Sequence, residues 1–90
     1  MNINSKINFL KCIFKMIEFN VFLTEEMETM AQRNVTYLLD KRPNDSVVKF
    51  LESKWLLKER LLDSALDAAK RSYAIEKTAA TWQLIQLIHE

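Results

Sequence analysis

The chain holds few side chains whose type and spacing could support chemistry. Its one cysteine, Cys12, and its one histidine, His89, lie at opposite ends of the 90 residues. A metal site needs several cysteine, histidine or clustered carboxylate ligands, and a reactive cysteine needs a basic, open setting. Cys12 instead lies in an apolar run, which predicts a small buried side chain. We expect His89 to be a solvated cation that stabilises the C-terminal end of a helix through the helix dipole.

Serines and paired carboxylates give no better basis for a reaction. Ser64 or Ser72 could be joined with His89 in a triad, but no nucleophile-elbow sequence positions either serine. Asp63 and Asp67 fall on a predicted solvated face, whereas glycosidase chemistry needs two carboxylates across a cleft. We therefore expect no enzyme activity, no cofactor and no metal.

The composition favours an all-helical protein. The chain contains no glycine and a single proline, Pro43. Glycine-rich phosphate-binding loops are therefore excluded, and tight hairpins of the Asn-Gly type are absent. The remaining sequence is rich in good helix formers such as leucine, alanine, glutamate and lysine. The formal net charge is only +1, so the chain has no strong overall field to attract nucleic acid.

The spacing of apolar residues predicts an all-α fold, a small antiparallel bundle of three to four helices in a single domain spanning residues 1–90. Thr24, followed by three glutamates, predicts the start of the second helix. Pro43 ends that helix, and Asp45 is one of three adjacent residues that could cap the next. The expected helices span residues 4–22, 25–41, 45–70 and 73–89.

The boundary between the last two predicted helices is weakly marked. Neither glycine nor proline occurs from residue 44 to residue 90, and the apolar stripe continues in phase from Tyr73 to Leu87. One continuous helix would extend about 65 Å at about 1.5 Å per residue and would need a dimer to cover it. We favour a break near residues 71–78, where Ser72 or Thr78 could cap the final helix.

Residues 1–23 are predicted to form an apolar-rich amphipathic helix at the N-terminus. Its polar residues recur every three or four positions and form one narrow stripe: Asn4, Asn8, Lys11, Lys15 and Glu18. The apolar face is wider than the roughly 100° that a surface helix needs. The favoured interpretation is a core helix of the chain's own bundle. The alternatives are docking on a partner protein, or lying in a membrane interface, through Phe9, Phe14, Phe19 and Phe22.

Two further groups of side chains are candidates for contact with a partner. Trp55 lies on an apolar stripe and Trp82 flanks one, so both are expected in the core; Trp82 is also the candidate interface anchor if it is exposed. A basic cluster in the third predicted helix could contact nucleic-acid phosphates; it consists of Lys49, Lys54, Lys58 and Arg60. Acidic residues are interleaved with it, so a mixed solvated face is favoured and nucleic acid is the less favoured partner.

The same features suggest a location and a function. Charged residues interrupt the N-terminal apolar run, which disfavours a membrane span, and no secretory signal is recognisable. A lone cysteine favours a reducing compartment, so we expect a cytoplasmic protein. We expect a non-catalytic binding or regulatory protein that contacts another protein, with a homodimer as one form. The alternatives are a peripheral membrane-associated protein and a nucleic-acid-binding modulator.

Overall fold

The computed structural model describes residues 2–89, and these residues form five helices. The helices are α1 (Ile3–Glu18), α2 (Glu25–Lys41), α3 (Ser46–Lys58), α4 (Leu62–Ile75) and α5 (Ala79–His89). The all-helical prediction is confirmed, and no strand occurs within the described range. The predicted number of three to four helices is wrong, because the segment expected to be one helix over residues 45–70 is two.

Side-chain caps begin three of the helices at residues that the sequence offered as caps. Thr24 Oγ1 accepts a hydrogen bond from the backbone N–H of Met27 (3.2 Å) at the start of α2. Asp45 Oδ1 accepts from the N–H of Val47 (2.8 Å) at the start of α3. Thr78 Oγ1 accepts from a first-turn N–H of α5 (3.1 Å). Each cap satisfies an N–H that the helix itself leaves without a partner.

The first helix ends four residues earlier than predicted. α1 stops at Glu18 because Asn20 adopts a left-handed backbone conformation with φ of 60°. The N–H of Val21 then bonds to the carbonyl of Met16 (2.8 Å), which is the long-range bond of a Schellman motif. Asparagine tolerates this conformation better than most residues. The chain therefore turns away before Phe22 could join the helix.

An equivalent motif separates α3 from α4 without glycine. Arg60 has φ of 63°, and the N–H of Leu61 bonds to the carbonyl of Leu56 (2.9 Å). Arginine has no local signal for this conformation, which costs roughly 1–2 kcal/mol for a residue with a Cβ. The break at residues 59–61 is therefore absent from the sequence pattern. The break predicted near residues 71–78 is present, between Ile75 and Ala79.

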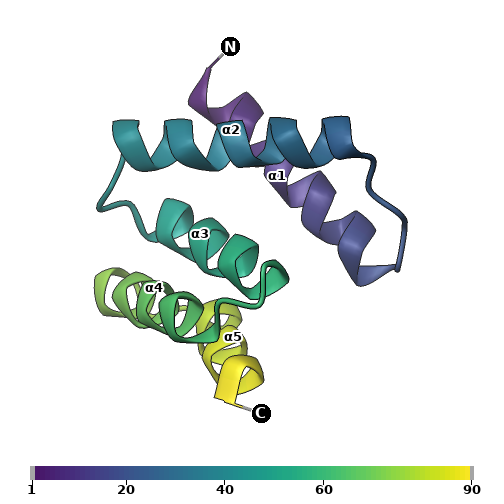
Figure 1. Cartoon of the computed structure of the whole chain (residues 1–90). Coiled ribbons are helices and arrows are strands. Elements are labelled where there is room, and N and C mark those ends of the chain that lie inside the picture. The colour runs from purple at the N-terminus through teal and green to yellow at the C-terminus, as the bar shows by residue number, and fades with distance from the viewer. Residues whose placement is uncertain (1, 90) are drawn as a thin grey trace.

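Helix α3 lies at the centre of the molecule, with α1 and α2 on one side and α4 and α5 on the other (Figure 1). Val48, Leu51 and Trp55 of α3 belong to the larger apolar cluster, which α1 and α2 complete. Phe50 and Leu57 of α3 pack against the smaller cluster, which lies between α4 and α5. Since α3 is apolar on two sides, it joins both clusters into one body. The radius of gyration is 12.3 Å, close to the roughly 12 Å expected for a compact chain of this length.

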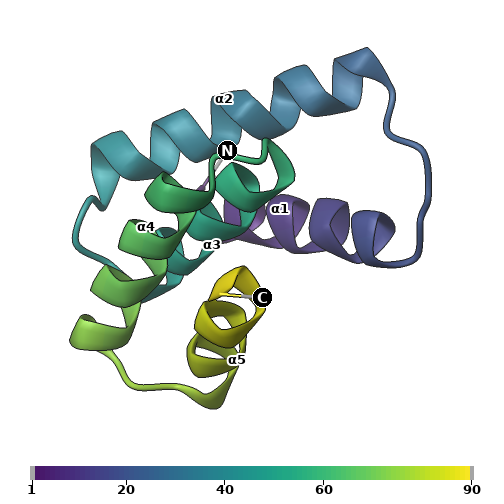
Figure 2. The same ribbon diagram turned by 60° about the horizontal axis from the view of Figure 1, so that its bottom comes forward.

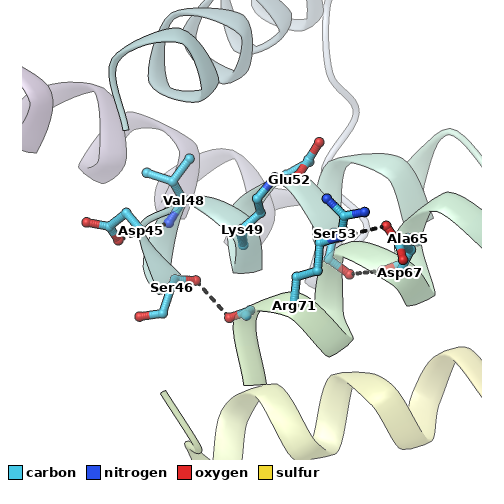
Figure 3. Close-up of polar contacts among 10 residues, drawn as sticks. Asp45, Ser46, Val48, Lys49, Glu52, Ser53, Ala65, Asp67 and Arg71 are labelled. Atoms are coloured by element: carbon cyan, nitrogen blue, oxygen red, sulfur yellow. Dashed lines mark hydrogen bonds and ion pairs between the residues drawn. The ribbon is translucent and has the colours of Figure 1, made fainter. Parts of the chain in front are cut away.

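Buried polar groups tie α3 to its neighbours. Ser53 Oγ donates to the backbone carbonyl of Ala65 in α4 (2.6 Å), as Figure 3 shows. Ser72 Oγ of α4 donates in the opposite direction, to the carbonyl of Ser46 (2.7 Å). On the other side of α3, Trp55 Nε1 donates to a glutamine oxygen of α2 (2.6 Å). These bonds fix how α2 and α4 lie along α3 because each joins a defined pair of residues.

Candidate functional site

The apolar face of α1 points into the molecule. Leu10 and Ile13 are almost fully buried, and Phe14 is 7% exposed, so Phe14 is mainly a core residue and offers little area to a partner. Phe9 is half-buried and packs against the same cluster. The predicted polar stripe of α1 is exposed along its whole length. The helix therefore serves as a core element, and its aromatic residues divide between the core and the surface.

The exposed aromatic residues of this region lie just after α1. Phe22 is 87% exposed and Phe19 is 72% exposed, and Val21 between them is also exposed. The Schellman motif at Asn20 causes this arrangement, because it turns the chain outward while Leu23 returns to the core. The surplus apolar area expected for the N-terminal helix is thus concentrated in the connection between α1 and α2.

An apolar groove lies between α1 and α5, and residues of α3 also line it. These two helices stay apart in both views and do not pack closely on each other over the described residues (Figure 1, Figure 2). We call this feature the α1–α5 groove; it has a volume of about 330 Å³ and is lined by Phe14, Ile17, Glu18, Lys54, Leu57, Lys58, Leu84 and Leu87. Because Leu87 at one wall is 55% exposed, the groove presents apolar area directly to solvent.

A second hollow continues from this groove toward the connection between α1 and α2. We call it the loop hollow; it has a volume of about 500 Å³ and is lined by Ile17, Asn20, Val21, Phe22, Leu23, Glu25, Glu28 and Lys58. Ile17 and Lys58 line both features. The groove and the hollow therefore form one continuous surface, which we call the α1–α5 surface, with Phe22 at one end and Leu87 at the other.

Lys54 is the half-buried cation of the groove. Its ammonium lies 5.3 Å from the ring centroid of Phe14 and 5.3 Å from that of Phe50, in the range of cation–π attraction. It forms no ion pair with a carboxylate among residues 2–89. Burial lowers the pKa of Lys54 below 10.5; the charge of Glu18 opposes this effect and that of Lys15 adds to it. Its charge is therefore only partly compensated.

Lys58 is held in place between the groove and the loop hollow. Its ammonium lies 3.5 Å from a carboxylate oxygen of Glu28 and 3.9 Å from one of Glu59. The same ammonium lies 4.8 Å from the ring centroid of Trp55. These contacts join α2 and α3 beside one cation at the middle of the α1–α5 surface.

The four residues of the predicted basic cluster do not form a field of free cations. Lys49 lies 3.3 Å from Glu52 in α3, and both side chains, which Figure 3 shows, line a pocket between α3 and α4. Lys58 is paired with glutamates, and Lys54 covers two aromatic rings. Arg60 is exposed in the turn between α3 and α4. The four residues have the expected spacing along the sequence, but their side chains contact different neighbours.

The remaining candidate residues lie away from this surface. Trp55 is 3% exposed, as expected for a core residue, whereas Trp82 is 49% exposed. Trp82 packs against Tyr73 of α4 with ring centroids 5.8 Å apart, and it does not line the α1–α5 groove. Cys12 is exposed, so the prediction of a buried cysteine is wrong: it lies beside the polar stripe, on the outer face of α1.

Sequence reasoning missed most residues of the α1–α5 groove. Leu84 and Leu87 lie on the apolar stripe of the last helix, and such a stripe alone predicts a face packed on the core. Leu84 is 5% exposed and meets that expectation while also lining the groove. Leu87 lies one turn further along α5 and is 55% exposed. Only the helix arrangement distinguishes these two leucines.

No group of three or more histidine, cysteine, aspartate or glutamate side chains lies close enough together to hold a metal ion in residues 2–89. Over the same range, none of the helices combines the length and apolar character required to span a bilayer. Comparison with models of protein families, with curated proteins and with solved structures gave no significant match.

Proposed function

We propose that this chain is a non-catalytic binding protein that acts through contact with another protein at the α1–α5 surface. The observation that carries the proposal is the exposed apolar lining of a groove between two helices that do not cover each other. A groove of this kind suits an amphipathic helix, which lays its apolar face between two others. Leu87 and Phe22, both more than half exposed, are its expected anchors.

The polar groups of the surface are compatible with a specific protein partner. Lys54 and Glu18 flank the apolar lining of the groove, and polar groups around an apolar centre are typical of protein interfaces. A partner that carries a carboxylate opposite Lys54 would compensate its charge. The lone cysteine continues to support a cytoplasmic location, which we propose on that basis.

The two alternative functions have less support. A membrane-associated role would depend mainly on Phe19, Val21 and Phe22, because Leu10, Ile13 and Phe14 of the apolar face of α1 are buried. A nucleic-acid-binding role would need free cations, whereas Lys49 and Lys58 are paired with glutamates. Neither alternative has an observation that favours it over a protein partner.

The proposal is tested by affinity capture from the native host with three forms of the full chain. Leu87→Asp places a charge in the groove at an exposed position, so the fold is expected to persist. Ile75→Asp is the matched control, because Ile75 is exposed to a similar degree, 50% against 55%, at the end of α4. We expect a protein retained by the wild type and the control and lost with Leu87→Asp.

The captured protein is then purified and titrated against each form. An affinity at least tenfold weaker for Leu87→Asp, about 1.4 kcal/mol of binding free energy, supports the groove as the contact surface. Equal affinity for all three forms, or no retained protein at all, would refute it. Circular dichroism of the variants shows whether the helices have persisted.

A further inference from the structure

The α1–α5 surface carries both a projecting apolar side chain and an apolar depression. Phe22 projects from the loop hollow and is 87% exposed, the highest exposure among the large apolar residues described. The groove at the other end is lined by apolar atoms of Leu57, Leu84 and Leu87. A two-fold interface uses the same patch on both copies, so one patch must supply both parts. This surface meets that requirement.

Charge is distributed along the surface in the same complementary way. At the groove end, Lys54 has no carboxylate partner among the described residues, and at the hollow end Glu25 has no cation partner among them. Between these ends lie Ile17 and Lys58, which the two depressions share. A two-fold rotation about this middle exchanges the ends and brings Lys54 of each copy toward Glu25 of the other.

We propose that the α1–α5 surface binds a second copy of the chain, in a two-fold dimer in which Phe22 of each copy enters the α1–α5 groove of the other. This inference deepens the proposed function, on which it rests for the surface, by naming one occupant. A partner protein that uses the groove then has to displace the second copy.

The size of the molecule is sufficient for such an interface. A stable protein interface buries about 800 Å² on each partner, which is roughly one-eighth of the 6082 Å² of accessible surface of this chain. The molecule measures 32 × 28 × 20 Å along its principal axes, so a broad face has room for that area. The dimer covers Phe22 and Leu87, two of the most exposed apolar side chains.

Light scattering after size-exclusion chromatography tests the proposal with the full chain. Loading concentrations run from about 1 μM to about 200 μM, because dimerisation follows mass action. We expect the wild type to approach twice the chain mass of 10.6 kDa. Phe22→Asp is expected to remain monomeric, with self-association weakened at least tenfold, and Ile75→Asp to behave as the wild type.

Charge reversal tests the two-fold arrangement itself. Lys54→Glu alone and Glu25→Lys alone each place like charges at both junctions, so both variants are expected to be monomeric. An equal mixture of the two variants places opposite charges at both junctions, and it is expected to restore the mass of a dimer. Glu25 is exposed, so its reversal leaves the core intact, and circular dichroism reports whether Lys54→Glu remains helical.

A wild type that stays monomeric at the highest concentration overturns the proposal, as does a dimer that Phe22→Asp leaves intact. If neither charge reversal weakens the dimer, Lys54 of one copy does not pair with Glu25 of the other, and the proposed two-fold arrangement is wrong. The proposed function fails separately: a monomeric wild type whose captured partner is still lost with Leu87→Asp refutes the dimer alone. Conversely, a wild-type dimer that Phe22→Asp abolishes, together with no protein captured from the host, would refute the proposed function and leave the dimer supported.

Discussion

Single residues determine two of the helix ends, and Arg60 is the less expected of them. Its backbone is left-handed, with φ of 63°, although its Cβ makes this conformation unfavourable. The neighbouring apolar contacts and the bond from Leu61 to Leu56 must therefore hold it there. The Arg60 side chain forms no ion pair among the described residues. No charge pairing therefore offsets the free-energy cost of its backbone conformation.

Replacing Arg60 by glycine should stabilise the protein. Glycine adopts positive φ without steric cost, and this gain exceeds the entropy that glycine adds to the unfolded chain. We expect Arg60→Gly to raise the free energy of unfolding by about 0.5–1 kcal/mol, measured by urea denaturation. Lys70→Gly, within α4, is the control and should lower it by about 1 kcal/mol. An Arg60→Gly variant no more stable than the wild type would contradict this account.

Lys54 gives the stability of the protein a dependence on alkaline pH. Burial lowers the pKa of Lys54 in the folded chain below the ordinary value of 10.5 that it has when unfolded. Between those two pKa values the unfolded chain holds more protons, so raising the pH through this window favours the folded state. Below the folded pKa, the cost of burying the charge is fully present.

This effect is isolated by comparing the wild type with Lys54→Met. As the pH rises from 7 toward 10.5, the free energy of unfolding of the wild type is expected to increase relative to that of the variant, measured by urea denaturation at each pH. Lys11→Met, which removes an exposed lysine of α1, controls for the loss of a surface charge. A difference between wild type and Lys54→Met that stays constant or falls with pH would show that burial of Lys54 has no such consequence.

At the scale of the elements, the contact between α3 and α4 depends on serine hydroxyls as well as apolar packing. Ser53 is completely buried and donates to the carbonyl of Ala65 across the contact (2.6 Å). Alanines at positions 65, 68 and 69 of α4 are buried too, so the two backbones can approach closely. A larger side chain at Ser53 would have no room, and a smaller one would lose the bond.

Removing the Ser53 hydroxyl should therefore loosen the pair of helices. Ser53→Ala is expected to lower the free energy of unfolding by about 1–2 kcal/mol, because it removes a buried hydrogen bond. Ser64→Ala, at an exposed position of α4, should change it by no more than about 0.5 kcal/mol. Thermal denaturation of both variants gives the comparison, and equal stability of the two would mean that the hydroxyl of Ser53 contributes nothing.

The sequence predicts the presence of these elements better than their ends. Caps such as Thr24 and Asp45 carry a side-chain signal, and both begin helices in the structure. The end of α3 depends on the left-handed backbone of Arg60. Tertiary contacts hold this conformation, and no local sequence pattern indicates it. The same limit applies to the site. Periodicity identifies Leu87 as apolar, but only the separation of α1 from α5 leaves it exposed.

At the scale of the molecule, residues 2–89 form two apolar clusters of unequal size, and both contact the central helix α3. The larger contains ten buried residues from α1, α2, the connection between them and α3, whereas the smaller contains three, Ala69, Leu84 and Ile85, from α4 and α5. Stability is uneven in such a fold, because a region with fewer buried apolar contacts opens at lower free energy. Helix α5, which is also a wall of the α1–α5 groove, is therefore the element expected to open first.

Hydrogen exchange of the backbone amides tests this division. Leu84→Ala should destabilise the smaller cluster by about 2–4 kcal/mol, and protection is expected to fall most in α5 and the end of α4, and less in α1 and α2. Leu10→Ala, at a fully buried position of the larger cluster, is the matched comparison and should lower protection in all five helices. If Leu84→Ala instead lowers protection equally everywhere, the two clusters open as a single cooperative unit, and the groove wall is as stable as the core.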